Sequence, residues 1–181
     1  MILSKQLLGM FLVAIFLGTV SAGSAGESAQ ARIARALSAG PSLVASGATV
    51  VDVDAHGKAT TLRKGTNGFT CFPGHKGVIG DDPACLDAQA MIWNNDWLAH
   101  KPRPTNTQPG IMYMFAGAAD YSATNPWATK AVKPLREGPH WMIMWPYDPK
   151  KTGLSSKASD DGTWIMWADT PYAHLMINQH W

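Results

Sequence analysis

Four short apolar runs in the C-terminal half of the chain have the alternating pattern that is typical of β-strands. Each is too short for an ordinary helix, and Gly, Pro, Asn or Asp stands near most of their ends. Alternate residues of a strand point to the same face, so each run is expected to present two different faces. The four runs are GIMYMFAG, HWMIMW, TWIMWA and AHLMIN, with long loops expected at about 118–139 and 147–162.

The N-terminal half of the chain predicts a helix and three further strands. The segment ESAQARIARALSAG has a helical spacing of apolar residues and ends in Gly40 before Pro41, which is a typical stop signal. ATVVDVD and ATTLRKG flank AHGK, a pattern that indicates a β-hairpin with glycine in its turn. GFTCF is expected to form the third strand.

A second helix is predicted in the middle of the chain. Asp82 is a suitable N-cap, Pro83 suits the first helical position, and the helix should end near His100. On this prediction Cys85 lies in the first turn. One apolar stripe follows the helical spacing, made of Leu86, Ala90, Trp93 and Trp97.

The order helix, three strands, helix, four strands predicts an α+β domain. We expect a mostly antiparallel sheet of about six or seven strands, with one or two helices packed on one face. Residues 26–181 are long enough for one domain with a real core and too short for two comfortable ones.

The first 25 residues are typical of a signal peptide. Lys5 is followed by an apolar stretch, Leu7–Val20, and by the small residues VSAGSA, which predict cleavage after Ala22 or Ala25. We therefore expect a periplasmic or secreted protein without a membrane anchor after cleavage.

Cys71 and Cys85 are the two cysteines of the chain, and an exported protein is expected to join such a pair in a disulfide. The span between them is rich in Gly and Pro, which lets it turn back on itself. The alternative is a metal site formed by both cysteines with His75, although the Cys-x3-His-x9-Cys spacing matches no zinc motif that we know.

The charge of the chain argues against a nucleic-acid partner. Fifteen Lys and Arg residues face 13 Asp and Glu, a net charge of +2, and no basic stripe is evident. Electrostatic capture of nucleic acid requires clustered basic residues. A small ligand or a metal ion is the partner class that the sequence leaves open.

The string KGTNGFTCF…DDPACLD, between about residues 64 and 87, resembles a group of uncharacterised exported bacterial proteins. The resemblance extends to TPYAH near the C-terminus. It implies a bacterial cell envelope, but it carries no activity that could be transferred to particular residues.

Histidine and methionine recur on one expected face of the apolar strands. Thioether and imidazole ligands suit soft ions such as Cu(I), and the pattern resembles that of bacterial copper-handling proteins of the cell envelope. The sequence therefore suggests a non-catalytic binding protein with Cu(I) as a candidate ligand. The candidate residues are His140, Met142, Met144, His174 and Met176, with Met112 and Met114 in reserve.

Two alternatives compete with metal binding. Methionine is a flexible core filler that packs well against aromatic rings, so these residues could serve packing alone in a structural envelope protein. A secreted hydrolase could instead pair His140 or His174 with Asp120, Asp148 or Asp169, although no catalytic motif selects such a pair. The register of the strands decides whether the two histidine–methionine segments meet.

Overall fold

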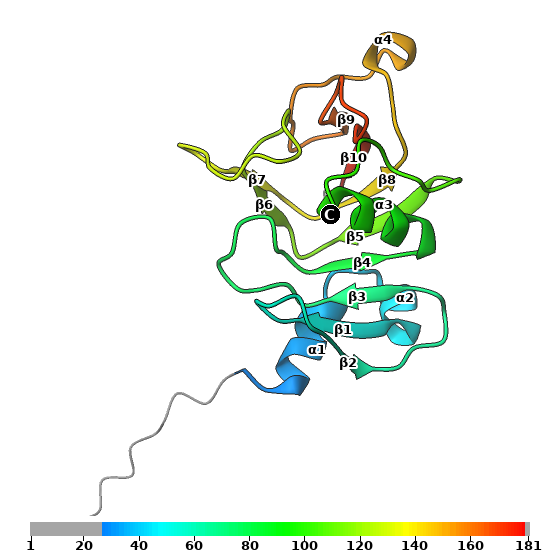
Figure 1. Ribbon diagram of the computed structural model, residues 1–181, viewed down its shortest axis with the longest axis vertical. Helices are drawn as coiled ribbons and strands as arrows, with labels where there is room; N and C mark the ends of the chain where they lie inside the picture. The colour runs from blue at the N-terminus through cyan, green and yellow to red at the C-terminus, as the bar shows by residue number, and fades with distance from the viewer. Residues whose placement is uncertain (1–26, 180–181) are drawn as a thin grey trace, which may run out of the picture.

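The computed structural model describes residues 27–179, which form an eight-stranded sheet, a two-stranded hairpin and four helices (Figure 1). The signal peptide expected at residues 1–25 lies outside the described residues. The helices are α1 (Ala29–Leu37), α2 (Ser42–Gly47), α3 (Ala88–Leu98) and α4 (Pro149–Thr152). The strands are β1 (Thr49–Val53), β2 (Ala59–Arg63), β3 (Thr70–Phe72), β4 (Ala84–Leu86), β5 (Gly110–Met114), β6 (Ala118–Asp120), β7 (Leu135–Glu137), β8 (His140–Met144), β9 (Thr163–Met166) and β10 (His174–Asn178).

The strands of the main sheet run in the order β2-β1-β3-β4-β5-β8-β10-β9. Only the pair β1 and β3 is parallel, and every other neighbouring pair in this sheet is antiparallel. The expected α+β class with a mostly antiparallel sheet is therefore confirmed. All seven strands anticipated from the sequence are present, and β4 adds an eighth to the sheet.

Helices cover both faces of the sheet, whereas the sequence suggested one face. Cys71 and Cys85 lie in a buried cluster with Ala36 of α1, while the next residue, Leu86, belongs to the larger cluster with Trp93 of α3. Because neighbouring strand residues point to opposite faces, α1 and α3 lie on opposite sides of β4. Both faces of these central strands are apolar, so each requires a cover.

The predicted start of the central helix is wrong. Asp82 and Pro83 precede the strand β4, and α3 begins at Ala88 with Asp87 as its N-cap. Asp82 instead accepts a hydrogen bond of 2.8 Å from the backbone N–H of Ala119. Asp82 and Pro83 have the local pattern of a helix start, but the residues that follow them form a strand because they pair with β3 and β5.

The expected disulfide between Cys71 and Cys85 is confirmed, so these cysteines do not form a metal site with His75. Cys71 and Cys85 are directly opposite each other on the antiparallel strands β3 and β4. Since Cys85 lies in β4, the bond joins two strands and not a helix to a strand. Its formation requires an oxidising compartment, in agreement with an exported protein.

Replacing both cysteines with alanine is expected to lower the free energy of unfolding by about 3 kcal/mol, because the bond closes a short loop in the unfolded chain. Urea denaturation of the parent with and without reductant, beside the Cys71→Ala/Cys85→Ala variant, measures the effect. Reductant should shift the parent alone. An unchanged midpoint for the reduced parent would contradict the prediction.

Asp87 and Gly110 determine where α3 lies on the sheet. The Asp87 carboxylate accepts hydrogen bonds from the N–H of Ala90 (2.8 Å) and of Ile111 (2.9 Å), which ties the start of α3 to β5. A Cβ atom at Gly110 would lie 2.2 Å from the backbone nitrogen of Ala90. Only glycine allows this close approach, which brings Trp93 and Trp97 over the sheet.

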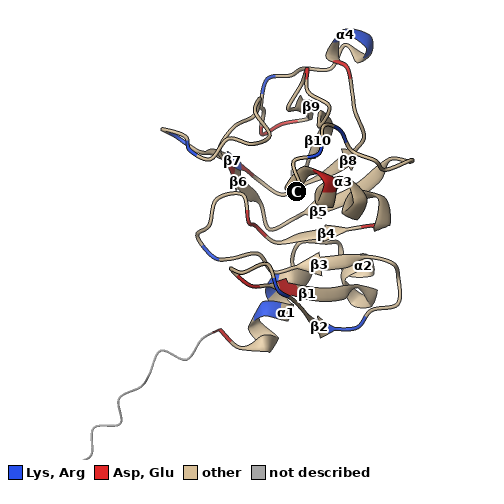
Figure 2. Ribbon diagram, viewed as in Figure 1, with Lys and Arg blue, Asp and Glu red and all other residues tan. Residues whose placement is uncertain are grey.

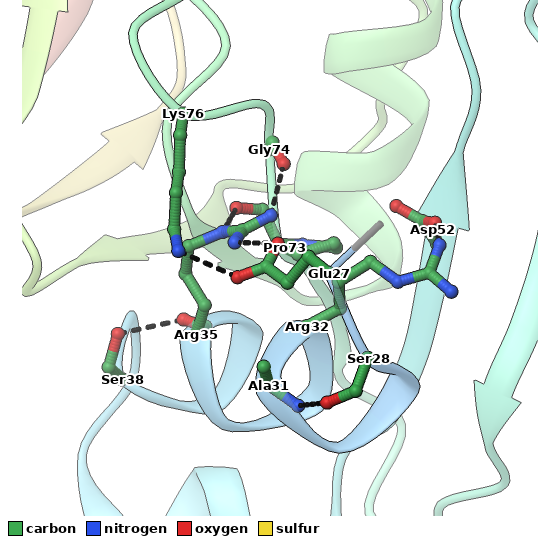
Figure 3. Close-up of polar contacts among 10 residues, drawn as sticks. All are labelled: Glu27, Ser28, Ala31, Arg32, Arg35, Ser38, Asp52, Pro73, Gly74 and Lys76. Carbon is green, nitrogen blue, oxygen red and sulfur yellow. Dashed lines mark hydrogen bonds and ion pairs between the residues drawn. The ribbon is translucent and has the colours of Figure 1, made fainter. Parts of the chain in front are cut away.

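On the other side, α1 holds the segment that follows β3 (Figure 3). Arg35 donates hydrogen bonds to the carbonyl oxygens of Pro73 (2.8 Å) and Gly74 (3.0 Å), and Glu27 pairs with both Arg35 and Lys76. This segment forms one wall of the site described below.

Among residues 27–179, no helix has the length and apolar character needed to cross a bilayer.

Candidate functional site

A cavity of about 1030 Å³ lies on the α3 face of the sheet. Its floor is formed by strands of the main sheet, and α3 contributes Trp93 and Trp97 to one side. Pro73 and Gly74 line it from the segment after β3, and Asp120 and Glu137 line it from the hairpin of β6 and β7. The volume suits a small ligand, and most of the lining is apolar with a few polar groups, as in many binding sites.

All seven histidines and methionines selected from the sequence line this one cavity. Four of the methionines also belong to the main hydrophobic cluster, so they are buried and face the cavity at the same time. Met166 of β9 joins the same lining. The residues brought together are Met112, Met114, His140, Met142, Met144, His174 and Met176.

The register places the two histidine segments side by side but offset. β8 and β10 are antiparallel neighbours, with Met142 opposite Met176 and His140 opposite Asn178. His174 pairs with Met166 on the other side of β10. His140 and His174 are therefore four residue positions apart along the strands, roughly 13 Å between backbones. They lie at the two ends of the sheet face that carries these histidines and methionines, which we call the His/Met face.

His140 lines the cavity and has one buried ring nitrogen without a hydrogen-bond partner. The residue is fully buried, and its Nδ1 is 2.8 Å from the carbonyl oxygen of Gly138. A carbonyl only accepts, so Nδ1 carries the proton and Nε2 keeps its lone pair. Nε2 is buried without a hydrogen-bond partner. Burial lowers the pKa of His140, which the Gly138 carbonyl opposes in part, and this favours the neutral ring.

His174 is in the same state at the other end of the face. Its Nδ1 donates to the carbonyl of Tyr172 at 3.0 Å, so its Nε2 also holds a lone pair. Burial lowers the pKa of His174 to about 4; the Tyr172 carbonyl acts in the opposite direction, and a positive charge on His140 lowers the pKa further. Both imidazoles are thus prepared as neutral ligands or acceptors.

An aromatic shell surrounds His174. The ring of Trp93 lies edge to face with His174, with centroids 5.3 Å apart, and Trp167 does the same at 4.9 Å. Trp93 and Trp167 are themselves stacked at 5.9 Å. Trp167 has a left-handed backbone with φ +53°, which is held by hydrogen bonds of 2.9 Å to Ala123 and Ser122. Strained backbone of this kind is retained where neighbours over-determine it, often beside a site.

The sequence did not predict that Asp120 and Glu137 lie together in the β6–β7 hairpin; it named Asp120 only as a possible partner of a catalytic histidine, and it did not name Glu137. Asp120 ends β6 and Glu137 ends β7, within the region expected to be a long loop. Burial, followed by the charges of Asp120, Asp160 and Asp82, raises the pKa of Glu137 to about 8. Burial and the charge of Asp82 raise the pKa of Asp120 to about 6. Perturbed carboxyls of this kind in a cavity are typical of functional sites.

The arrangement does not support the hydrolase alternative. The Nδ1 atoms of His140 and His174, which would need to donate to an aspartate, donate to backbone carbonyls. Within residues 27–179, the one histidine paired with an aspartate is His75, with Asp81 at 2.5 Å.

The same region holds no group of three or more His, Cys, Asp or Glu side chains arranged to bind a metal ion. A site for zinc or calcium built from those ligands is therefore not favoured.

Comparison of the chain with protein-family models, curated proteins and solved structures found no match.

Proposed function

We propose that this protein is an exported, non-catalytic binding protein that holds Cu(I) on the His/Met face of its cavity. The observation that carries the proposal is the buried Nε2 of His140, which has no hydrogen-bond partner, in a residue that lines the cavity together with several methionines. A buried acceptor without a donor is uncommon in folded proteins and invites a partner.

The register gathers soft ligands around His140. Met114 is directly opposite His140 on β5, and Met142 is two residues along the same face of β8. Met112 is in turn opposite Met142. Opposite Cβ atoms on neighbouring strands are about 5 Å apart, and methionine side chains are long and flexible enough to converge on one ion. Imidazole with thioethers is a donor set that favours Cu(I).

The protein environment supports the ligand chemistry. The carbonyl of Gly138 holds the His140 ring and fixes its tautomer, which is a common arrangement for histidines that bind metals. Because the ring is neutral, no proton has to leave before a metal binds. Both cysteines are used in the disulfide, so sulfur donors at this site come from methionine.

The other end of the face, with His174, Met144 and Met176, offers the same donor types. His174 packs edge to face against Trp93 and Trp167, and both histidine side chains are almost completely buried. Of the two, only His140 has a buried Nε2 without a hydrogen-bond partner. We therefore place the ion at the His140 end and assign the His174 end a secondary role.

An anaerobic Cu(I) titration against a competing chelator tests the proposal. The parent should bind Cu(I) stoichiometrically, and His140→Phe should weaken the affinity at least about tenfold, because it removes the imidazole ligand at that end. Met114→Leu and Met142→Leu keep the side-chain volume and should weaken binding as well.

His56→Ala is the matched control, because His56 is exposed in the turn between β1 and β2 and does not line the cavity. It should bind Cu(I) like the parent. The proposal is wrong if the parent takes up no Cu(I), or if His140→Phe binds as tightly as His56→Ala.

A further inference from the structure

The cavity is also lined by several acidic residues, and Cu(I) binding does not explain them. Histidine is the only basic residue type in its lining: among the described residues that line it, there is no lysine or arginine. Figure 2 shows Lys and Arg dispersed over α1, α4 and outer loops. The acidic residues of the lining are Asp52, Asp54, Asp81, Asp82, Asp120 and Glu137.

Three of these carboxylates already have structural partners. Asp52 pairs with Arg32 of α1 (Figure 3), and Asp81 pairs with His75. Asp54 accepts hydrogen bonds from the backbone N–H groups of the β1–β2 turn at 2.9 and 3.0 Å. Asp82 also accepts one backbone hydrogen bond, from the N–H of Ala119. Within the described residues, however, Asp82, Asp120 and Glu137 form no ion pair with a basic side chain.

These three carboxyls converge from three segments. Ala118 is opposite Glu137 in the β6–β7 hairpin, so Asp120, two residues beyond Ala118, shares the face of Glu137. Asp82 reaches the same hairpin, since its carboxylate accepts from the N–H of Ala119 at 2.8 Å.

Glu137 is the residue whose surroundings indicate a bound ligand. Only 9 % of its surface is exposed, it lines the cavity, and its Oε1 atom is buried without a hydrogen-bond partner. Within the described part of the chain, neither Glu137 nor Asp120 forms an ion pair with Lys or Arg. These residues also do not form a group suited to a metal ion. An N–H donor with positive charge would supply the missing partner and would favour the ionised form of Glu137.

The charges around Glu137 agree with this reading. Asp120 on β6, Asp82 before β4 and Asp160 in the loop before β9 all raise its pKa, after the larger effect of burial. Arg136, the neighbouring cation, is exposed, and its charge acts on Asp82. A cation placed among the three carboxyls would relieve their mutual repulsion.

The rest of the cavity suits an apolar body. Met91, Trp93 and Trp97 line it from α3, and Met114 lines it from the sheet. Trp rings contribute large apolar area and attract organic cations through their faces. We propose that the acidic end of the cavity binds the ammonium group of an organic amine, whose apolar body lies against the Met and Trp side chains.

Calorimetric titration of the copper-free protein with 2-phenylethylammonium and octylammonium chloride tests this proposal. Each amine is compared with its alcohol, 2-phenylethanol or octanol, which keeps the apolar body without the charge. The parent should bind at least one amine, with the matching alcohol at least about tenfold weaker. Glu137→Gln and Asp120→Asn should each weaken amine binding by a similar factor.

The exposed carboxyl of Asp161 supplies the matched control, because it does not line the cavity. Asp161→Asn should bind the amine like the parent. If neither amine binds the parent, if amine and alcohol bind equally, or if Glu137→Gln binds as the parent does, the amine site is refuted.

The same variants separate this proposal from the Cu(I) proposal. Glu137→Gln should take up Cu(I) like the parent, because Glu137 is not among the His/Met ligands. Loss of amine binding with Cu(I) uptake intact assigns two separate sites, and failure of either titration leaves the other result standing.

Discussion

At about pH 9, Glu137→Gln is expected to raise the free energy of unfolding by several kcal/mol above that of the parent, up to about 5 kcal/mol. At about pH 5 the two proteins should differ by less than about 1 kcal/mol. A substitution that removes a native ionisable group would thus stabilise the fold, by an amount that grows as the pH rises from about 5 to about 8.

The direction follows from the pKa of Glu137, which rises from 4.5 to about 8 on folding. Between these values the folded protein binds more protons than the unfolded chain, so its stability falls as the pH rises through this window. Above the folded-state pKa, the parent must keep an ionised carboxylate buried near Asp120 and Asp82. Glutamine has a similar shape and never ionises, so the variant avoids this cost.

Urea denaturation followed by tryptophan fluorescence at the two pH values measures the difference. Asp161→Asn, which removes an exposed carboxyl, should unfold like the parent at both. Equal stabilities of parent and Glu137→Gln at the alkaline pH would show that Glu137 is not held as a buried acid. The test is independent of any ligand.

Trp93→Ala is expected to lower the free energy of unfolding by about 3–5 kcal/mol, with a fall in Tm of roughly 10 °C. Trp93 is 1 % exposed and contacts Trp167, Tyr172 and His174 through its ring. Removal of the ring leaves a void that the stacked partners cannot fill, because Trp167 is held in place by its own hydrogen bonds.

Thermal unfolding and urea denaturation of Trp93→Ala and Trp93→Phe measure this effect, and the phenylalanine variant should recover part of the loss. Trp145→Ala is the comparison: this side chain follows the end of β8 and is only half-buried, so its loss should cost less. A Trp93→Ala protein within about 1 kcal/mol of the parent would contradict the assigned packing.

The strands could be predicted because their apolar runs alternate over several residues. β8 follows the expected pattern, with His140, Met142 and Met144 buried on one face and Trp141 and Ile143 half-buried on the other. The strands β4, β6 and β7 were missed because each has only three residues and was assigned to a helix or a loop. β3 is equally short, but the apolar run GFTCF around it indicated a strand. Such short segments show too little periodicity to be recognised as strands in the sequence, and they form strands because neighbouring strands pair with them.

The residues of the candidate site also fall into those that could be predicted from the sequence and those that could not. The histidines and methionines were visible because they recur at alternate positions of strong strands. Glu137 was not, since it stands in the sequence PLREG beside Arg136, where a solvated carboxylate is the ordinary expectation. Its burial results from the β6–β7 hairpin lying beside the cavity.

By itself, the sequence determined the α+β class, seven of the eight strands of the main sheet, the pairing of the cysteines and the shared face of each His/Met segment, because these follow from local periodicity and from counting. The tertiary structure decided the offset register of His140 and His174, the true start of α3 at Ala88 and the meeting of Asp82, Asp120 and Glu137. These depend on contacts between residues far apart in the chain, whose energies no local pattern contains.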